Sequence, residues 1–348
     1  MKFLKKFINS KGVTLSPKVY FIDGLSFMAL GLFSTLIIGL IIKTIGEQLQ
    51  LISNLATIGT YFQEMGTLAM GLMGPGIGVA VAFGLKAPPL VIFSAIVAGA
   101  AGAPLGGPAG SFIAALLATE FGKLVSRETK VDIIVTPFVT IFVGFLVGTF
   151  IGPPISAGLQ YFGEVIMWAT EQQPIIMGVI VAVLMGLALT APISSVAIAL
   201  MLGLEGLAAG AATIGCAAQM VGFAVSSYRE NKISGLFAMG IGTSMLQVPN
   251  IIKNPLILIP PTVAGAILAP IGITFFSMIN NSAGAGMGTS GFVGQIMTFS
   301  AMGFSTTVLL QVLLLHIISP AVISLIISEW MRKKSYIKNG DMKINLGG

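Results

Sequence analysis

The chain has very few residues of the kinds that carry metal, redox or nucleophilic chemistry. Its 348 residues include one cysteine and one histidine, and only 9% of them are charged. A single cysteine excludes an internal disulfide and a cysteine-cluster metal site, and a single histidine excludes a histidine-pair site. Cys216 lies in the apolar run Ala-Thr-Ile-Gly-Cys-Ala-Ala, where a small packing residue is expected. We therefore expect no metal and no cofactor.

Motifs of energy-coupling and hydrolytic enzymes are also missing. The sequence has no Walker phosphate loop, no paired-acid motif and no nucleophile elbow. No apolar segment carries the repeated arginines of a voltage sensor. These absences argue against a self-contained catalytic centre and against ATP-driven transport by this chain alone. Facilitated, ion-coupled or partner-coupled transport remains open.

What the chain does contain is apolar sequence. It is 55% hydrophobic with a mean hydropathy of +0.98, whereas a soluble domain carries roughly 25% charged residues. We predict an all-α polytopic membrane protein with about 10–12 transmembrane segments, some of them broken by Gly and Pro or re-entrant. The net charge of +6 comes from basic residues at the ends and between spans, which indicates cytoplasmic segments rather than nucleic-acid binding.

The polar links divide the apolar sequence into segments. The links 46–64 and 156–173 have amphipathic character and are expected outside the spans, the first as an interfacial helix. Segment 88–102 is shorter than the about 20 residues that a straight span needs, so it is short, tilted or re-entrant. The span 131–151 is expected to stop at Pro153-Pro154. The expected segments are 21–45, 65–85, 88–102, 109–125, 131–151, 174–189, 192–204, 207–225, 233–248, 256–276 and 306–327.

An internal repeat organises the segments. Shifting the chain by 104 residues gives eight identities over thirty positions, with Pro88 on Pro192 and Gly102 on Gly206 among them. We predict a duplication with both copies running in the same direction, as in parallel-repeat transporters. The expected organisation is a basic lead at 1–19, one transmembrane domain at 20–330 and a basic tail at 331–348; the domain holds copies at 66–152 and 174–276 and an addition at 277–330.

Charge sets the expected topology. A cytoplasmic start places the basic links 126–130 and 228–232 inside, in agreement with the positive-inside rule. Both termini are then cytoplasmic. For the basic tail to end inside, the region after Phe276 must cross twice, which makes 291–304 a short crossing segment.

The most unusual stretch is 278–295, Met-Ile-Asn-Asn-Ser-Ala-Gly-Ala-Gly-Met-Gly-Thr-Ser-Gly-Phe-Val-Gly-Gln. It has no charge, and its glycines disfavour a regular helix. Irregular backbone survives in lipid only where protein or a wet cavity surrounds it. We predict a binding site for a neutral, hydroxyl-rich solute here; the alternative is a flexible surface loop between spans. The candidate ligands are Asn280, Asn281, Ser282, Thr289, Ser290 and Gln295.

Three polar residues elsewhere could assist this stretch. Glu205, at a Gly-rich break, either binds a hydroxyl or a coupling proton or faces the outer aqueous side. His316 lies inside Leu-Leu-Leu-His-Ile-Ile and either contacts solute, relays a proton or makes a packing hydrogen bond. Gln219 is an uncharged group at membrane depth that could face the same cavity. Outside this set, Glu120 is one turn from Lys123 and is expected to form an ion pair with it.

Three motifs resemble one known family. Gly84-Leu-Lys-Ala-Pro-Pro89, Gly102-Ala-Pro-Leu-Gly-Gly-Pro-Ala-Gly-Ser111 and Ile279-Asn-Asn-Ser-Ala-Gly-Ala-Gly-Met-Gly-Thr-Ser-Gly291 are similar to segments of the membrane (IIC) component of bacterial phosphoenolpyruvate-dependent sugar phosphotransferase systems. Within that family, the chain looks most like the small branch that includes the perfringolysin O regulator. The resemblance implies a dimeric permease in the bacterial cytoplasmic membrane that moves a sugar inward while a separate IIB protein, supplied by IIA, phosphorylates it.

The chain departs from a complete system because it has no soluble region with a phosphorylatable cysteine or histidine. At most it is the membrane subunit of a sugar phosphotransferase. Two alternatives stay open. One is a membrane sensor or regulator that keeps a transporter fold; the other is an ion-coupled transporter of another small solute.

Overall fold

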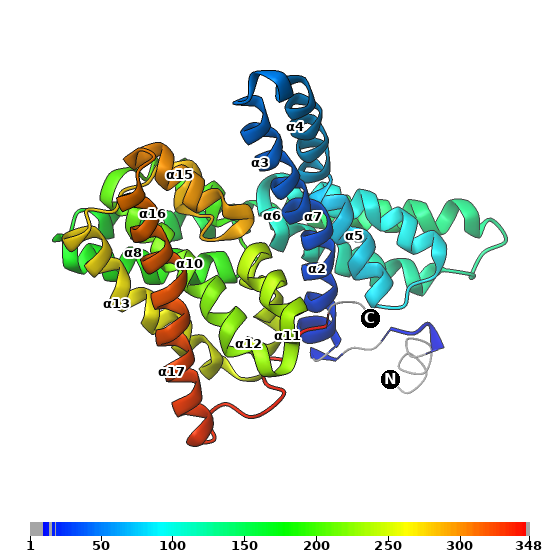
Figure 1. The fold of residues 1–348 in the computed structure, drawn as a ribbon. Helices are drawn as coiled ribbons and strands as arrows, with labels where there is room; N and C mark the ends of the chain where they lie inside the picture. Colours follow the sequence, from blue (N-terminus) through cyan, green and yellow to red (C-terminus); the bar gives the residue numbers. More distant parts are fainter. Residues whose placement is uncertain (1–9, 14–15, 18, 346–348) are drawn as a thin grey trace. The chain divides into compact units, whose positions relative to one another are not determined.

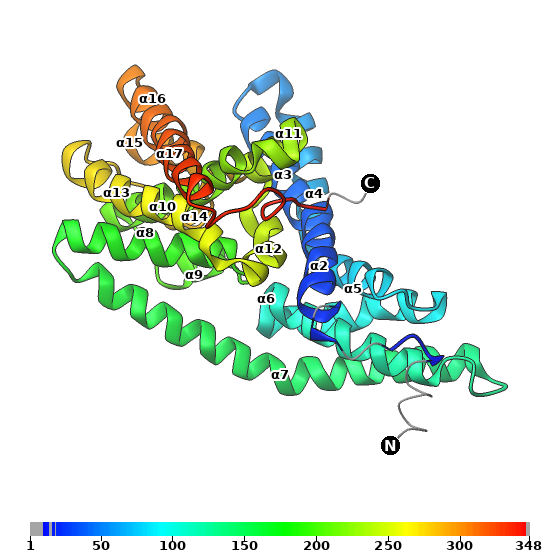
Figure 2. The same ribbon diagram turned by 90° about the horizontal axis from the view of Figure 1, so that it is seen from below.

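The computed structural model describes residues 10–13, 16–17 and 19–345, and this part of the chain is almost entirely helical, with no strand (Figures 1 and 2). Six helices are long and apolar enough to cross a membrane, or up to seven if one bent pair counts as a single span. The all-α, multi-pass prediction is confirmed. The number of candidate spans is lower than the about 10–12 expected from segment lengths.

The count is lower because several expected segments form helices too short to span alone, such as α8 (Pro174–Thr190) and α9 (Ser195–Met201). Segments 88–102 and 109–125 form the two arms of α6 (Pro89–Val125), which is interrupted at Gly107, and α7 (Asp132–Thr170) continues through Pro153 and Pro154. The expected end at these prolines, and the separate link at 156–173, are therefore wrong. A proline removes one backbone donor, and a membrane helix tolerates it where neighbouring groups satisfy the freed carbonyls.

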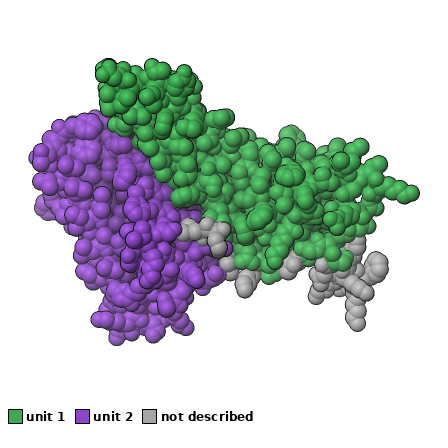
Figure 3. Space-filling model, turned by 45° about the vertical axis from the view of Figure 1, so that its right-hand side comes forward, with its two compact units in different colours: residues 1–158, 346–348 green, residues 159–345 purple. Residues whose placement is uncertain are grey.

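The contacts divide the chain into two compact units, residues 1–158 with 346–348 and residues 159–345 (Figure 3). The boundary falls within α7. The predicted repeat copy 66–152 belongs to unit 1 and the copy 174–276 to unit 2. Both copies break within one residue of the same aligned position, since Pro88 (ψ 154°) and Ala191 (ψ 159°), each followed by a proline, are extended residues after a helix. The duplication itself stays a prediction, as does the basic lead, of which residues 1–9, 14–15 and 18 lie outside the described part.

The N-terminal part of unit 1 is a helical hairpin. Helix α2 (Leu25–Leu32) continues through a π-helical segment (Phe33–Ile37) into α3 (Ile38–Gln50), and α4 (Ala56–Gly71) packs antiparallel on α3. Glycines permit the close approach: Gly39 lies against Gly66, and Gly46 against Gly59. The interfacial helix expected at 46–64 is therefore wrong. These residues form the tip of the hairpin because glycines seven residues apart on each helix let the two backbones touch.

We expect Gly46→Ala to destabilise this hairpin. A Cβ at Gly46 would lie 2.5 Å from the Gln63 nitrogen and 2.6 Å from the Gly59 oxygen. Overpacking of this kind costs about 1–3 kcal/mol, so the thermal unfolding midpoint in detergent should fall. Gly71→Ala, on the same hairpin, is the matched control, because a Cβ there meets no atom within 4 Å. Equal midpoints for the two variants would contradict the packing described here.

The remainder of unit 1 packs around a second hairpin formed by α6. The helix reverses at Gly107 (φ 55°, ψ −143°), so that Gly102 lies against Gly110 and Gly122 against Val91. Helix α5 (Met73–Gly84), bent by 50° from the helical stretch Ser53–Gly71 that includes α4, packs on the first half. The expected Glu120–Lys123 ion pair is confirmed at 3.1 Å, and it is buried.

Unit 2 is built around α10 (Gly206–Ser226). Its small residues, mostly Ala and Gly, allow helices to pack on every side, and 94% of its 18-residue apolar window is buried. Helices α8 (Pro174–Thr190), α13 (Ile259–Phe275) and α17 (Ser319–Lys333) contact it. The shorter helices are α9 (Ser195–Met201), α11 (Tyr228–Phe237), α12 (Val248–Lys253), α14 (Ser282–Ala285), α15 (Val293–Met302) and α16 (Thr306–Val312).

Candidate functional site

The Gly-rich stretch 278–295 is a buried loop in unit 2. It contains α14 and leads into α15, and its glycines touch neighbouring backbones directly: Gly286 lies against Ser195 and Gly288 against Cys216. A side chain at either glycine would collide with these backbones. Asn280, Thr289, Ser290 and Gln295 are at most 5% exposed. The burial excludes the alternative of a flexible surface loop.

Helix α15 is too short to be the crossing segment expected at 291–304. Its ten residues span about 15 Å, and the hydrocarbon core is about 30 Å thick. The helix starts after Phe292 in left-handed conformation (φ 60°) and ends at Gly303 (φ 87°), where the chain turns into α16. The loop is thus buried in unit 2, and α15 contributes Val293, Gly294, Gln295 and Thr298 to the interior.

Asn280 fixes the loop. Its Nδ2 donates toward Thr213 Oγ1 on α10 (2.7 Å) and toward the Gly294 oxygen and Thr298 Oγ1 on α15 (both 3.0 Å). Its Oδ1 accepts from the Asn281 backbone (2.8 Å), and its own backbone N–H donates to the Gly206 oxygen (3.2 Å). All polar atoms of the side chain are therefore hydrogen-bonded to protein, and Asn280 links α10 to α15.

Gln295 and His316 form a pair with unused hydrogen-bonding capacity. Gln295 Nε2 lies 3.2 Å from the Gly288 oxygen and 3.2 Å from His316 Nδ1. Because the amide N–H groups serve both acceptors, the ring proton of His316 is assigned to Nε2. Gln295 Oε1 and His316 Nε2 are buried and have no partner among the described residues. An acceptor and a donor are thus left for a bound hydroxyl, which both donates and accepts.

A π-helical turn positions the histidine. The segment η8 (Leu313–Ile318) interrupts the regular helix between α16 and α17, and His316 within it is 1% exposed. Single π turns of this kind occur frequently at functional sites, because the extra residue redirects one side chain without ending the helix.

The remaining predicted residues do not join this pair. Glu205 is exposed at the N-terminus of α10, where its Oε1 accepts from the backbone (3.3 Å) and hydroxyl (3.2 Å) of Ser282. Asn281 caps α14 by accepting from the Gly284 N–H (3.1 Å). Ser290 donates to the Gly242 oxygen (2.8 Å). Thr289 donates to Met220 Sδ (3.5 Å).

Gln219 belongs to a second buried polar cluster. Its Nε2 donates to Thr262 Oγ1 (2.8 Å), and Thr190 lies 3.4 Å from its Oε1 and 2.8 Å from the Ser244 hydroxyl. The cluster connects α8, α10 and α13. It is uncharged, as is the Gln295–His316 pair.

The architecture and the buried uncharged groups agree with one comparison. A family model described as "Phosphotransferase system, EIIC" matches residues 22–344. The chain belongs to this family. It is therefore a multi-pass membrane permease component of a phosphotransferase system. No protein with a curated description matches the chain in sequence.

Some residues of these buried polar clusters could not be found from the sequence. Thr213 and Thr298, which hold Asn280, lie in Gly- and Ala-rich or mixed apolar segments where a threonine is usually a packing residue. Thr190, Ser244 and Thr262 come from three segments that the sequence gives no reason to bring together. The only feature of the sequence that could have indicated these residues is a hydroxyl side chain among small residues. Many other positions in this chain have the same feature.

Proposed function

We propose that this EIIC protein moves a neutral, hydroxyl-rich solute, a sugar, across the bacterial cytoplasmic membrane. The unpartnered acceptor of Gln295 and donor of His316 support this proposal. A sugar hydroxyl satisfies both groups, and an unsatisfied buried polar group otherwise costs about 1–3 kcal/mol. No charged side chain belongs to the pair, so an ionic solute would be left without a counter-charge in a dry site.

The phosphoryl donor in this proposal is a separate IIB protein, itself supplied by IIA. Cys216, the only cysteine, is buried and its thiol donates to the Met185 oxygen (3.3 Å). His316, the only histidine, is also buried. Neither is accessible to a soluble phosphocarrier. A homodimer, cytoplasmic termini and membership in the small branch are parts of the same proposal.

Uptake in proteoliposomes tests the proposal. The purified chain is reconstituted with and without phosphorylated IIB, and radiolabelled neutral sugars are compared with the carboxylate analogues of the same sugars. We expect uptake of one neutral sugar at least tenfold above empty vesicles, with trapping as the phosphate ester when IIB is present. The carboxylate analogue should be transported far less. Binding without flux would instead support a sensor, and uptake that follows the pH gradient without IIB would support an ion-coupled transporter.

A further inference from the structure

The basic C-terminal segment is bound to unit 2 rather than free. Four amide side chains hold its backbone: Asn231 and Gln247 donate to the Met342 oxygen (2.8 and 2.9 Å), Asn250 to the Lys343 oxygen (2.9 Å) and Asn254 to the Tyr336 oxygen (3.0 Å). Asn231 also accepts from the Ile344 N–H (2.9 Å), and Met342 is fully buried. Residues 335–345, which we call the strap, therefore form part of the fold at the end of α17.

A buried ion pair lies under the strap. Arg332 Nη2 is 2.9 Å from Glu230 Oε1, and the two side chains are 9% and 2% exposed. The guanidinium also donates to the Ser226 oxygen (3.0 Å), and its other amino group lies 3.5 Å from the Lys338 oxygen. Its Nε is buried without a partner among the described residues. One donor of this arginine is thus unused.

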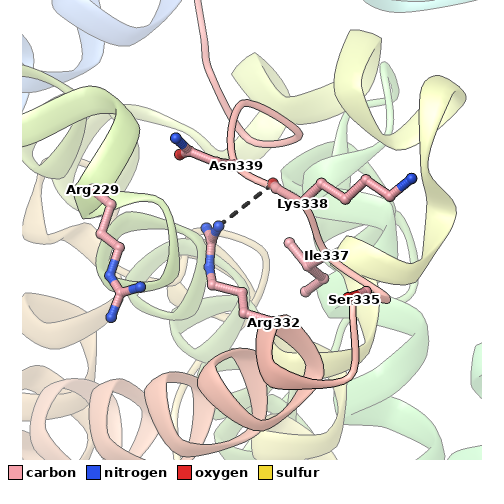
Figure 4. Close-up of a pocket in the computed structure, with 6 residues that line it drawn as sticks. All are labelled: Arg229, Arg332, Ser335, Ile337, Lys338 and Asn339. Atoms are coloured by element: carbon pink, nitrogen blue, oxygen red, sulfur yellow. Dashed lines mark hydrogen bonds between the residues drawn. The ribbon is translucent and has the colours of Figure 1, made fainter.

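Arg332 lines a basic cavity of about 560 Å³ between α11, α17 and the strap. Figure 4 shows Arg332 between Arg229 and the strap, with Asn339 above the two arginines and the Lys338 side chain extending away from them. The other lining residues are Ser335 and Ile337. The two segments that build this end, 228–232 and 329–343, contain seven Lys or Arg and three Asp or Glu. The cavity therefore favours an anion.

A second cavity adjoins the first and is mainly apolar. It measures about 350 Å³ and is lined by Val225, Leu236 and Leu325, with Tyr228 and Ser226. Arg229 and Glu329 line it as well, and they form an ion pair of 2.8 Å. Arg229 lines both cavities, so the basic and the apolar cavity adjoin at this side chain.

Exposed aromatic residues near these cavities are typical of the level of lipid headgroups. Trp330 and Tyr336 are 55% and 51% exposed, with ring centroids 6.3 Å apart, and Tyr228 is 43% exposed. Trp and Tyr concentrate where the membrane meets water. Ile326, one turn before Trp330 on α17, is 63% exposed and suits contact with lipid chains.

We propose that the two cavities form a binding site for an anionic phospholipid. The phosphate and headgroup occupy the basic cavity, which Arg229, Arg332 and Lys338 line, and an acyl chain lies in the apolar cavity against Leu236 and Leu325. Basic pockets between membrane helices bind anionic headgroups in this way. The site is separate from the Gln295–His316 pair and does not depend on the transported solute.

Lys338→Gln tests the headgroup contact, with Lys334→Gln as the matched control. Both changes remove one positive charge from the same end, but Lys334 lines neither cavity. The delipidated full chain is titrated with phosphatidylglycerol and with phosphatidylcholine of the same acyl chains, and bound lipid is counted by native mass spectrometry. We expect preference for phosphatidylglycerol, weakened about fivefold by Lys338→Gln and unchanged by Lys334→Gln. Arg332 is left intact because removing it would strand the buried Glu230 carboxylate.

Leu236→Trp distinguishes the binding of a lipid from the binding of free phosphate. The larger ring fills the apolar cavity, so it should weaken phosphatidylglycerol binding while inorganic phosphate is unaffected. Equal binding of the two phospholipids would overturn the proposal, and so would equal losses in the Lys338→Gln and Lys334→Gln variants. If inorganic phosphate binds as tightly as the lipid and Leu236→Trp has no effect, the cavity binds soluble phosphate instead, and the lipid site is wrong.

Discussion

Asn280→Ala is expected to unfold the Gly-rich loop and to abolish transport. The substitution leaves Thr213, Thr298 and the Gly294 oxygen without their common donor, and it removes the acceptor of the Asn281 N–H. Unsatisfied buried groups cost about 1–3 kcal/mol each, and partial relaxation should leave a net loss of about 2–4 kcal/mol. The thermal unfolding midpoint in detergent should fall by roughly 5–10 °C.

Asn281→Ala is the matched control for this result. Asn281 is adjacent and is the same residue type, but it is only half-buried, and its main contribution is to cap the short helix α14. Loss of a cap costs about 1 kcal/mol. Similar unfolding midpoints for the two variants would contradict the role of Asn280 as the link between α10 and α15. The glycine contacts alone would then account for the position of the loop.

The sequence was sufficient to predict the membrane fold and the part of the chain that is unusual within it. Glycines separated by small polar residues cannot form a stable exposed helix, so the stretch 278–295 was predicted to need a protein environment, and it is buried. The breaks at Ala87-Pro88 and Ala191-Pro192 were visible for a similar reason, because the residue before a proline avoids helical backbone. Both features depend on residues that are neighbours in the sequence, so they can be predicted from a single sequence.

Features that depend on partners far along the chain were not predictable. The sequence shows Pro153 and Pro154 but not the surroundings that let α7 continue through them. The glycines of α3 and α4 permit a hairpin, yet the same residues also fit an interfacial helix. The basic end of the chain was expected to be a tail, since nothing local shows that Gln247 and Asn250 bind it across roughly a hundred residues.

In the candidate site too, the sequence shows which residues are polar but not which partners they have in the fold. Nine residues were predicted on their polarity alone, and polarity does not distinguish a side chain that binds protein from one that is left for solute. In the structure, Asn280 and Ser290 have their polar atoms engaged, whereas Gln295 and His316 each keep one atom unpartnered. Unused hydrogen-bonding capacity, which only the fold reveals, is the property on which we propose Gln295 and His316, rather than Asn280 and Ser290, as solute contacts.

His316→Phe is therefore expected to lose transport while the fold is retained. Phenylalanine keeps the flat ring but removes the Nε2 donor, and within the described residues the only bond lost is the 3.2 Å contact with Gln295. Because the buried Nε2 has no protein partner, its loss should leave the free energy of unfolding within about 1 kcal/mol of the wild type. A buried hydrogen bond to solute is worth about 1.5 kcal/mol or more, so uptake at low solute concentration should fall at least tenfold.

Gln295→Leu and the double variant decide whether the two groups contact one solute. Gln295→Leu removes the unpartnered Oε1 and should reduce uptake by a similar factor, with some loss of stability because the Gly288 oxygen loses its donor. If both groups bind the same hydroxyl, the double variant should transport no worse than the poorer single variant, because residues that share a partner are not additive. If the fold losses in uptake of the two single variants multiply in the double variant, the two side chains make separate contacts instead.

Normal uptake by His316→Phe, with a lowered unfolding midpoint, would show that the histidine serves only to pack the helices.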